Sequence, residues 1–248
     1  MPKQRFAQIE NKNALIELLE DNKPISRLII ANNAYKDVKT KRIVELAREQ
    51  GIPIERRSRK SISRKSRTSS TESVMGFMII ENQITLEQLL SDTYARDDIP
   101  FFLILNEIRY PQNLGAIFRT AFAAGVNGII TSRQTGNLLS DEIIRISMGT
   151  ALRLPLVETH VFNAIKRLQK DDIKVYAMDM DGKSIYKQDL KGPVAFVLGS
   201  EDTGVSSKVL ERVNGTLAIP MRKGLGSLNV SASAAIIAYE KLRQELAG

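Results

Sequence analysis

The chain has 248 residues, of which 43% are hydrophobic and 26% are charged, a composition typical of a folded globular protein with one or two domains. It contains no cysteine and a single histidine, His160, which excludes disulfides, cysteine nucleophiles and metal sites built from thiolates or several histidines. The formal net charge of +8 and the isoelectric point near 9.6 favour a polyanionic partner.

The sequence also favours a cytoplasmic protein without a membrane segment. No apolar run approaches the roughly 20 residues of a membrane-spanning helix. The first ten residues lack the apolar stretch of a secretory signal. We therefore expect the protein to remain in the compartment where it is made.

The first 97 residues predict a small α/β domain. Hydrophobic periodicity indicates helices over 13–20 and 38–50, and strands over 27–31, 52–55 and 74–80. The charged segment 92–98 is typical of a linker and places a boundary near residue 97. The predicted domains are therefore 1–97 and 98–248.

A strongly basic tract follows the strand predicted over 52–55. It has no apolar periodicity and runs into a segment rich in Ser and Thr, which predicts an irregular loop. The loop is either an ordinary solvated surface or an RNA-binding arm; we favour the arm, because seven like charges repel one another unless a polyanion screens them. Its basic residues are Arg56, Arg57, Arg59, Lys60, Arg64, Lys65 and Arg67.

The second domain alternates between predicted strands and helices. The apolar run 100–105 is typical of a strand buried on both faces of a parallel sheet. Repeated strand and helix units predict a parallel sheet covered by helices. The strands are expected over 100–105, 126–131, 154–157, 174–178, 193–198 and 216–219, and the helices over 113–124, 161–170, 205–213, 229–246 and after a cap at 140–141.

Two glycine-bearing loops follow predicted strands of this domain. Gly199 and Gly204 follow one strand, and Gly224 and Gly226 follow another. Glycine lets backbone N–H and C=O groups approach a ligand closely, so the two loops together predict a small-molecule pocket. The spacing matches neither a phosphate-binding loop nor a dinucleotide-binding fingerprint, which disfavours a GTP-binding or NAD-binding protein.

Polar residues cluster where buried strands become helices. Each also has a simpler interpretation. Asn113 can be a helix N-cap, Arg119 can form a structural ion pair within an apolar helix, Glu201 can be a capping acid, and His160 can be a plain strand-to-helix connector. Ser227, Asn229 and Ser231 can cap the last helix. The set is Asn113, Arg119, Glu201, Ser227 and Asn229.

In their order along the chain these segments resemble the SpoU (TrmH) branch of the SPOUT RNA methyltransferases. The first family motif is similar to 113–121, with Asn113 and Arg119 at its polar positions. The second is similar to 198–204, with Glu201, and the third to 219–231. The resemblance extends from residue 100 to the C-terminus. The first domain more loosely resembles the ribosomal-protein-like RNA-binding domain of the rRNA ribose methyltransferases in this branch.

The resemblance implies a deep trefoil knot in the C-terminal domain, S-adenosylmethionine held in the knot loops, and a homodimer with its active site at the subunit interface. It implies no metal. The cofactor would contact Leu198, Gly199, Ile219, Met221 and Leu228, while the catalytic side would carry Asn113, Arg119, Glu201, Ser227 and Asn229. Methyl transfer to a ribose 2′-hydroxyl is an in-line displacement that needs alignment and an activated hydroxyl.

The mechanism proposed for the family that this chain resembles makes the arginine at position 119 the base that removes the proton of the ribose hydroxyl, although a guanidinium normally stays protonated. We prefer the hypothesis that it binds the target phosphate and stabilises the developing oxyanion.

The expected activity is ribose 2′-O-methylation of 23S ribosomal RNA. Alternatives are a tRNA methyltransferase, an rRNA methyltransferase that confers antibiotic resistance, and a non-catalytic RNA-binding or assembly factor.

Overall fold

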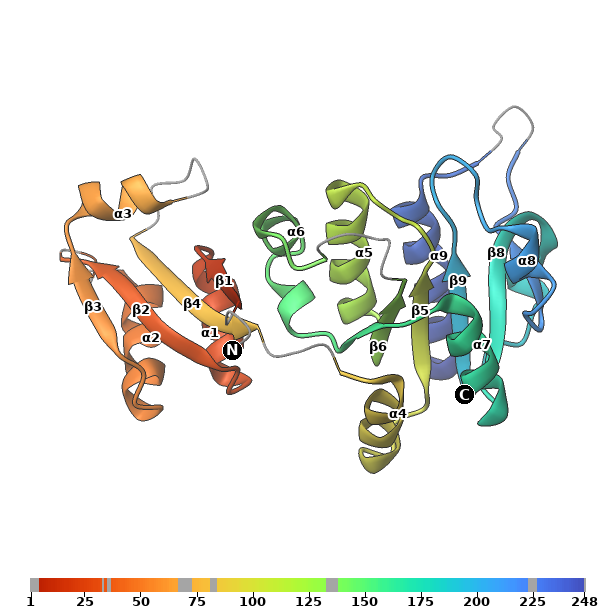
Figure 1. The fold of residues 1–248 in the computed structure, drawn as a ribbon, viewed down its shortest axis with the longest axis horizontal. Helices are drawn as coiled ribbons and strands as arrows, with labels where there is room; N and C mark the ends of the chain where they lie inside the picture. Colours follow the sequence, from red (N-terminus) through yellow and green to blue (C-terminus); the bar gives the residue numbers. More distant parts are fainter. Residues whose placement is uncertain are drawn as a thin grey trace. The chain divides into compact units, whose positions relative to one another are not determined.

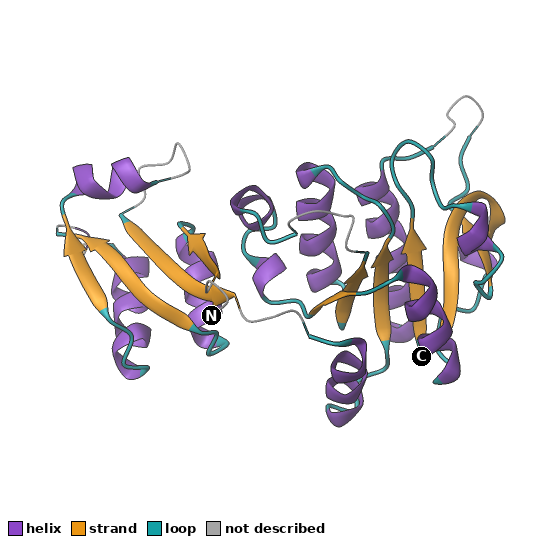
Figure 2. Ribbon diagram, in the orientation of Figure 1, coloured by secondary structure: helices purple, strands orange, loops and turns teal. Residues whose placement is uncertain are grey.

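The computed structural model describes residues 5–32, 34, 37–66, 73–80, 84–132, 138–222 and 227–247. The chain divides into two compact units, residues 1–82 with 139–153, and residues 83–138 with 154–248. Both units are built from helices and strands (Figure 1; Figure 2). No helix in the described ranges is long and apolar enough to cross a membrane.

The first unit contains a four-stranded mixed sheet in the order β1–β4–β2–β3. Strand β4 pairs antiparallel with β1 and β2, and β3 pairs parallel with β2. Strand β1 is absent from the predicted strands, because its apolar residues Phe6, Ala7 and Ile9 do not alternate with polar ones. The bounds are β1 Arg5–Ile9, β2 Ile25–Ala31, β3 Ile54–Arg57 and β4 Val74–Ile80.

Helices α1 (Lys12–Glu20) and α2 (Val38–Glu49) pack side by side in this unit. Both begin at a side chain that accepts a backbone N–H: the N-cap of α1 is Asn11 and that of α2 is Asp37. Their leucine, isoleucine and valine side chains join those of the strands in one buried core. The predicted helices are therefore confirmed, to within one residue at each end.

The basic tract is largely helical, so the prediction of an irregular loop is wrong. Helix α3 (Arg59–Lys65) begins at Ser58, whose hydroxyl accepts the backbone N–H of Ser61 at 3.2 Å. Ile62 is 1% exposed and belongs to the core of the unit. One buried side chain in seven residues is too little periodicity to reveal a helix.

The segment 139–153 belongs to the first unit although it follows two strands of the second. It contains α6 (Asp141–Ile146), capped by Ser140 as expected, and the short 3-10 helix η3 (Thr150–Leu152). Its apolar side chains join the core of the first unit. Arg153 forms ion pairs with two acidic residues of the α1 region, each at 2.6 Å.

The second unit contains a six-stranded parallel sheet in the order β10–β8–β9–β5–β6–β7. This confirms the predicted parallel α/β architecture. The two central strands, β5 and β9, are buried at every position, as their continuous apolar sequences indicate. The bounds are β5 Phe101–Leu105, β6 Gly128–Thr131, β7 Leu156–Glu158, β8 Lys174–Ser184, β9 Val194–Leu198 and β10 Gly215–Ala218.

Helices cover both faces of this sheet (Figure 1). Buried residues of α4 and α7 pack with one face of the strands, and α5 and α9 pack against each other on the other face. The linker predicted over 92–98 begins inside α4, where charged residues occupy the exposed side of the helix. The helices are α4 Leu86–Ala95, α5 Pro111–Ala123, α7 Val161–Lys170, α8 Ser207–Leu210 and α9 Val230–Leu246, with η4 Ile185–Lys187.

The strand order fixes where ligands can bind. The chain proceeds outward from β5 to β6 and β7, and then crosses to β8 on the other side of β5. The connection that follows β5 therefore leads to one side of the sheet, and the connection that follows β9 leads to the other. In open parallel sheets, ligands bind at the carboxyl ends of the strands near such a point.

Candidate functional site

A pocket of about 470 Å³ lies in the second unit, at the carboxyl ends of β9 and β10, the middle of β8 and the start of α9. All five residues expected to contact a cofactor line it, together with three of the five expected on the catalytic side. These residues are Leu198, Gly199, Ile219, Met221, Leu228, Glu201, Ser227 and Asn229. Segments about twenty residues apart in the sequence therefore form one cavity.

The loop after β9 is closed tightly on itself by backbone hydrogen bonds. Ser200 N–H donates to the carbonyl of Gly204 at 3.1 Å, and Gly204 N–H donates to the carbonyl of Ser200 at 3.0 Å. A Cβ atom on Gly199 would lie 2.1 Å from the carbonyl carbon of Gly204, and Gly204 has a φ of +66°. Both positions therefore require glycine for this loop shape.

A chain of three polar side chains joins the motifs of the predicted site. The Asn229 amide donates to Asn113 Oδ1 at 3.0 Å, and the Asn113 amide donates to Glu201 Oε1 at 2.7 Å. Asn229 Oδ1 accepts in turn from Ser231 N–H at 2.8 Å and from the Ser231 hydroxyl at 2.6 Å. Each amide donates to the next side chain in the direction of the carboxylate, and the last of these hydrogen bonds holds Glu201 in position.

The structure distinguishes the capping interpretations of these residues. Asn229 is the N-cap of α9, so the capping interpretation is confirmed there, and it bonds to Asn113 as well. Asn113 is not an N-cap: α5 is capped at Tyr110 and begins at Pro111. Asn113 lies in the first turn, is 9% exposed and points its amide at Glu201 instead.

Arg119 is not brought together with the other four residues. Six residues beyond Asn113, the helix has turned by about 240°, and Arg119 is exposed. It forms no hydrogen bond or ion pair with any residue in the described ranges, so a structural ion pair is excluded within them. Its guanidinium is free to bind an anion.

Sequence reasoning missed several lining residues. Met178, Asp179 and Met180 line the pocket from β8, and Ser233 lines it from α9. Strand β8 runs to Ser184, beyond the predicted end at Met178, and its pairing with β9 stops at Ala177, so Met178 to Met180 lie just past the part of the strand that pairs with β9. Ser233 lies one helical turn after Asn229 and was overlooked as an ordinary helix residue.

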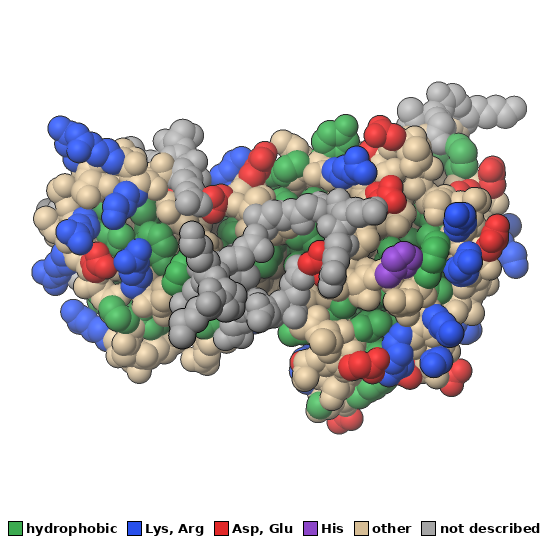
Figure 3. Space-filling view, in the orientation of Figure 1, with side chains coloured by type: hydrophobic (Ala, Val, Ile, Leu, Met, Phe, Trp, Pro, Cys, Tyr) green, Lys and Arg blue, Asp and Glu red, His purple; other side chains and the backbone are tan. Residues whose placement is uncertain are grey.

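The described basic residues of the tract 56–67 are exposed. Lys and Arg side chains gather on the face of the first unit shown in Figure 3. Among the basic residues of the tract, Arg57 forms an ion pair with Glu55 at 3.0 Å. Arg67 lies outside the described residues. The exposed set comprises Arg56, Arg57, Arg59, Lys60, Arg64 and Lys65.

Two anchors hold α3 on the sheet. The hydroxyl of Ser66 donates to Glu10 at 2.7 Å, and the Gln8 amide donates to the carbonyl of Lys65 at 2.9 Å. Glu10 itself is 6% exposed. The basic side chains are therefore presented by a fixed helix.

No group of three or more His, Cys, Asp or Glu side chains able to hold a metal ion occurs among the described residues. The pocket instead combines apolar side chains, backbone groups and the carboxylates of Asp179, Glu201 and Asp202. Such a lining suits a small organic ligand whose polar atoms are read by backbone groups.

Two family models match the chain. The model described as the SpoU rRNA Methylase family matches residues 100–239. A second, described as RNA 2'-O ribose methyltransferase substrate binding, matches residues 9–76.

Curated proteins and solved structures give the same pattern. The chain is 30% identical over 204 residues to the 23S rRNA (guanosine-2'-O-)-methyltransferase RlmB of Shewanella oneidensis, covering 82% of each chain. It is 29% identical over 228 residues to the protein of the same name from Pseudomonas aeruginosa, covering 90% of each. An AdoMet-bound rRNA methyltransferase from Sinorhizobium meliloti shares its fold, with a TM-score of 0.79, 24% identity, and coverage of 96% of this chain and 87% of that one.

Proposed function

The chain belongs to the SpoU rRNA Methylase family, and on this basis we propose that it transfers a methyl group from S-adenosylmethionine to a ribose 2′-hydroxyl of ribosomal RNA. The observation that carries the proposal is that the second and third motif segments line one pocket, while Asn113 of the first motif is joined to both by hydrogen bonds with Asn229 and Glu201. The relatives named as acting on 23S rRNA support that RNA as the substrate.

The lining of the pocket fits the cofactor. Its volume, about 470 Å³, lies in the usual range for small-molecule sites, roughly 300 to 1,000 Å³. Leu198, Leu217 and Ile219 supply apolar surface. The loop 199–204, which contains Gly199 and Gly204, brings backbone groups to the rim of the pocket. When bound, S-adenosylmethionine supplies the electrophilic methyl carbon.

The polar side chains position the acceptor hydroxyl. Because Glu201 Oε1 is held by Asn113, the carboxylate has a fixed direction, and its other oxygen is available to accept the hydrogen bond of a ribose hydroxyl. Holding the reacting atoms in line converts a bimolecular displacement into an effectively unimolecular one. Ser227 and Asn229 complete the polar rim of the pocket.

Arg119 binds the phosphate of the target nucleotide and stabilises the charge that develops on the 2′-oxygen. Its exposure and its lack of a partner among the described residues support this role. Because Arg119 does not line the pocket of its own chain, we propose that a homodimer formed through the second unit completes the site. Tyr110, 54% exposed before α5, and Tyr239, 49% exposed on α9, supply apolar surface for such a contact.

The first unit binds the RNA substrate, and the second is the methyltransferase domain. The exposed basic side chains of α3 contact phosphates, since α3 is fixed to the sheet and carries four of them. Changing Arg59, Lys60, Arg64 and Lys65 to Gln is expected to reduce the slope of log K against log salt by about 3, from roughly 0.7 per phosphate contact on single-stranded RNA. An unchanged slope would exclude this surface from RNA binding.

Two further properties belong to the same proposal. The second unit contains a deep trefoil knot, as the SPOUT relationship implies, and the protein works in the cytoplasm, where its ribosomal substrate is assembled. Stretching single molecules from both ends would test the knot: a knotted chain remains shorter than its full contour length when it is pulled taut.

The activity is tested by incubating the protein with S-adenosylmethionine labelled in its methyl group and with separated 16S rRNA, 23S rRNA and tRNA. Label in 23S rRNA alone is the expected result. Label in tRNA would favour the tRNA alternative. Failure to bind S-adenosylmethionine in calorimetry would favour a non-catalytic RNA-binding factor.

A further inference from the structure

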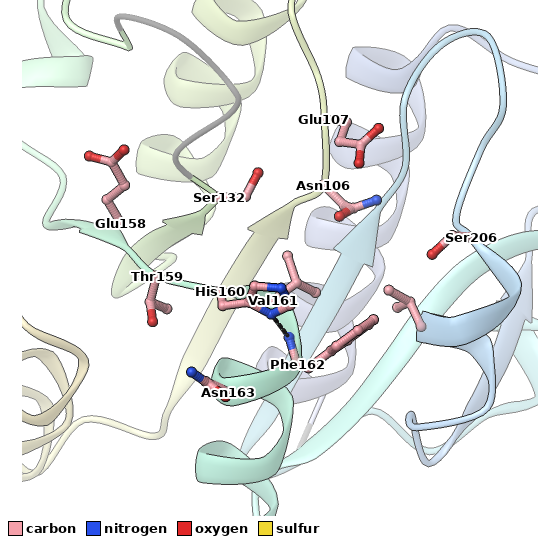
Figure 4. Close-up of a pocket in the computed structure, with 11 residues that line it drawn as sticks. Asn106, Glu107, Ser132, Glu158, Thr159, His160, Val161, Phe162, Asn163 and Ser206 are labelled. Carbon is pink, nitrogen blue, oxygen red and sulfur yellow. Dashed lines mark hydrogen bonds between the residues drawn. The ribbon is translucent and has the colours of Figure 1, made fainter.

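A second pocket, of about 520 Å³, lies in the second unit at the carboxyl ends of β5, β6 and β7 (Figure 4). It is distinct from the first pocket, and the two share no lining residue. They adjoin at the centre of the sheet, where the backbone N–H of Asn106 donates to the carbonyl of Leu198 at 2.9 Å. Asn106 lines the second pocket and Leu198 the first.

Asn106 carries an unused hydrogen-bonding group into this pocket. Its residue is only 8% exposed, and its side-chain amide forms no hydrogen bond with any residue in the described ranges. No buried side-chain nitrogen or oxygen atom in the described ranges lacks a partner, so the amide atoms of Asn106 reach the open space of the pocket, where a ligand can bond to them. An amide that offers a donor and an acceptor side by side is suited to the edge of a nucleobase.

The remaining lining is polar, acidic and partly aromatic. Glu107 and Glu158 are the charged lining residues, and no lysine or arginine lines the pocket among the residues described. The two carboxylates repel a phosphate and favour a neutral ligand with N–H donors. The side chains of Thr159 and Asn163 add hydrogen-bonding groups with no partner in the described part of the chain.

His160 supplies a flat ring at the pocket. It is exposed, and Figure 3 shows it on the molecular surface. Its Nδ1 accepts the backbone N–H of Phe162 at 3.3 Å, which caps α7 and fixes the imidazole against the Phe162 ring, with centroids 4.9 Å apart (Figure 4). A ring held in this way is a platform on which a base can stack.

The backbone at the pocket rim is strained at Glu107, where φ is +63°. Within the described ranges, four other non-glycine residues have positive φ, and each lies two positions after the end of a helix, where the left-handed conformation is common. Glu107 follows a strand instead. Strain of this kind is found at functional sites more often than elsewhere.

We propose that this second pocket binds an unpaired nucleobase of the RNA substrate, with Asn106 pairing with its edge, Glu107 and Glu158 accepting from its amino group, and His160 stacking on its face. The proposal rests on the proposed RNA methyltransferase function. Guanine, adenine and cytosine carry an amino donor and bind; uracil lacks one and binds least.

The test uses the full chain saturated with S-adenosylmethionine, so that nucleosides cannot enter the first pocket. Guanosine, adenosine, cytidine and uridine are titrated separately while backbone amides are followed by NMR. Saturable shifts at Thr159, His160 and Asn163 are expected, with uridine the weakest. Shifts at none of these amides with any nucleoside would overturn the proposal.

Three variants test the assigned contacts. His160→Asn keeps an N-cap acceptor for α7 but removes the ring, and should weaken nucleoside binding about tenfold. Asn106→Asp keeps the shape but loses the donor, and should weaken binding of the same nucleosides. Ser207→Ala is the control, because Ser207 is exposed next to the pocket residue Ser206 but does not line the pocket. Equal affinities for all three variants would refute the assigned contacts.

A second arm shows where the base comes from. In the second arm, RNA fragments that the protein methylates are prepared with one base removed at a time, and their affinities for the unchanged protein and for His160→Asn are compared. The two proteins should bind equally well only when the removed base is the one that occupies the pocket, either the target nucleotide or a neighbour. The two proposals fail separately. If S-adenosylmethionine does not bind, the proposed function fails; if methyl transfer occurs and no base removal matches the His160→Asn effect, only the second pocket fails.

Discussion

Replacing Asn113 with Asp tests the chain of polar side chains most sharply. The change keeps the acceptor for Asn229 but removes the donor to Glu201, so two carboxylates face each other where the amide and carboxylate are now 2.7 Å apart. At that separation two unit charges repel by about 1.5 kcal/mol in water and about 6 kcal/mol at an effective dielectric constant of 20. Asn113 is 9% exposed and Glu201 is half-buried, so the effective dielectric constant lies between these limits. We therefore expect the free energy of unfolding to fall by about 2 to 4 kcal/mol.

The assay is thermal unfolding of both proteins at pH 8 and pH 5. At pH 8 the melting temperature should fall by about 5 to 10 °C, since 1 kcal/mol corresponds to roughly 2 to 4 °C in a chain of this size. At lower pH the difference should shrink, because the pair of carboxylates takes up one proton and shares it. Asn113→Ala is the control: it removes the same hydrogen bond without adding charge, so its effect should not depend on pH. A pH-independent loss for Asn113→Asp would refute the reasoning.

Three other changes have defined outcomes. Arg119→Lys keeps the charge but loses the planar fork, so methyl transfer should slow at least tenfold while S-adenosylmethionine affinity, measured by calorimetry, stays the same; a full rate at every pH would exclude bidentate binding. Gly199→Ala places a Cβ against the backbone of Gly204 and should weaken cofactor binding at least tenfold, which unchanged calorimetry would contradict. Hydrogen bonds from Thr40, together with Lys12, lower the pKa of Asp37 to about 2. Because this pKa lies below the unfolded value, the stabilisation is present above about pH 4 and is lost as the pH falls towards 2. Asp37→Ala should cost about 1 kcal/mol at neutral pH and almost nothing at pH 2; a constant difference across this range would refute the assignment.

Strongly periodic segments could be predicted from the sequence. The helix over 161–170 and the strand over 74–80 have the predicted bounds, because each carries a clear apolar pattern between clear end signals. The residues that motif order assigns to the cofactor line one pocket. Their shared pocket follows from the rule that parallel strands end at one edge of a sheet.

Other features depend on tertiary contacts that no local pattern contains. Helix α3 is held by one isoleucine and by hydrogen bonds to Gln8 and Glu10, more than fifty residues away in the sequence. The segment 139–153 joins the first unit through its buried residues and Arg153. The role of Asn113 as a link to Glu201, rather than as a cap, depends on a contact across 88 residues.

The central claim is tested most directly by locating the transferred methyl group. Ribosomal RNA labelled from S-adenosylmethionine is digested with alkali, which cleaves beside every free 2′-hydroxyl but not beside a methylated one. Label in alkali-stable dinucleotides from 23S rRNA, lost with Asn113→Ala, is the result this account predicts. Label released with single nucleotides, which would place the methyl group on a base, or no transfer at all by protein that binds the cofactor, would contradict it.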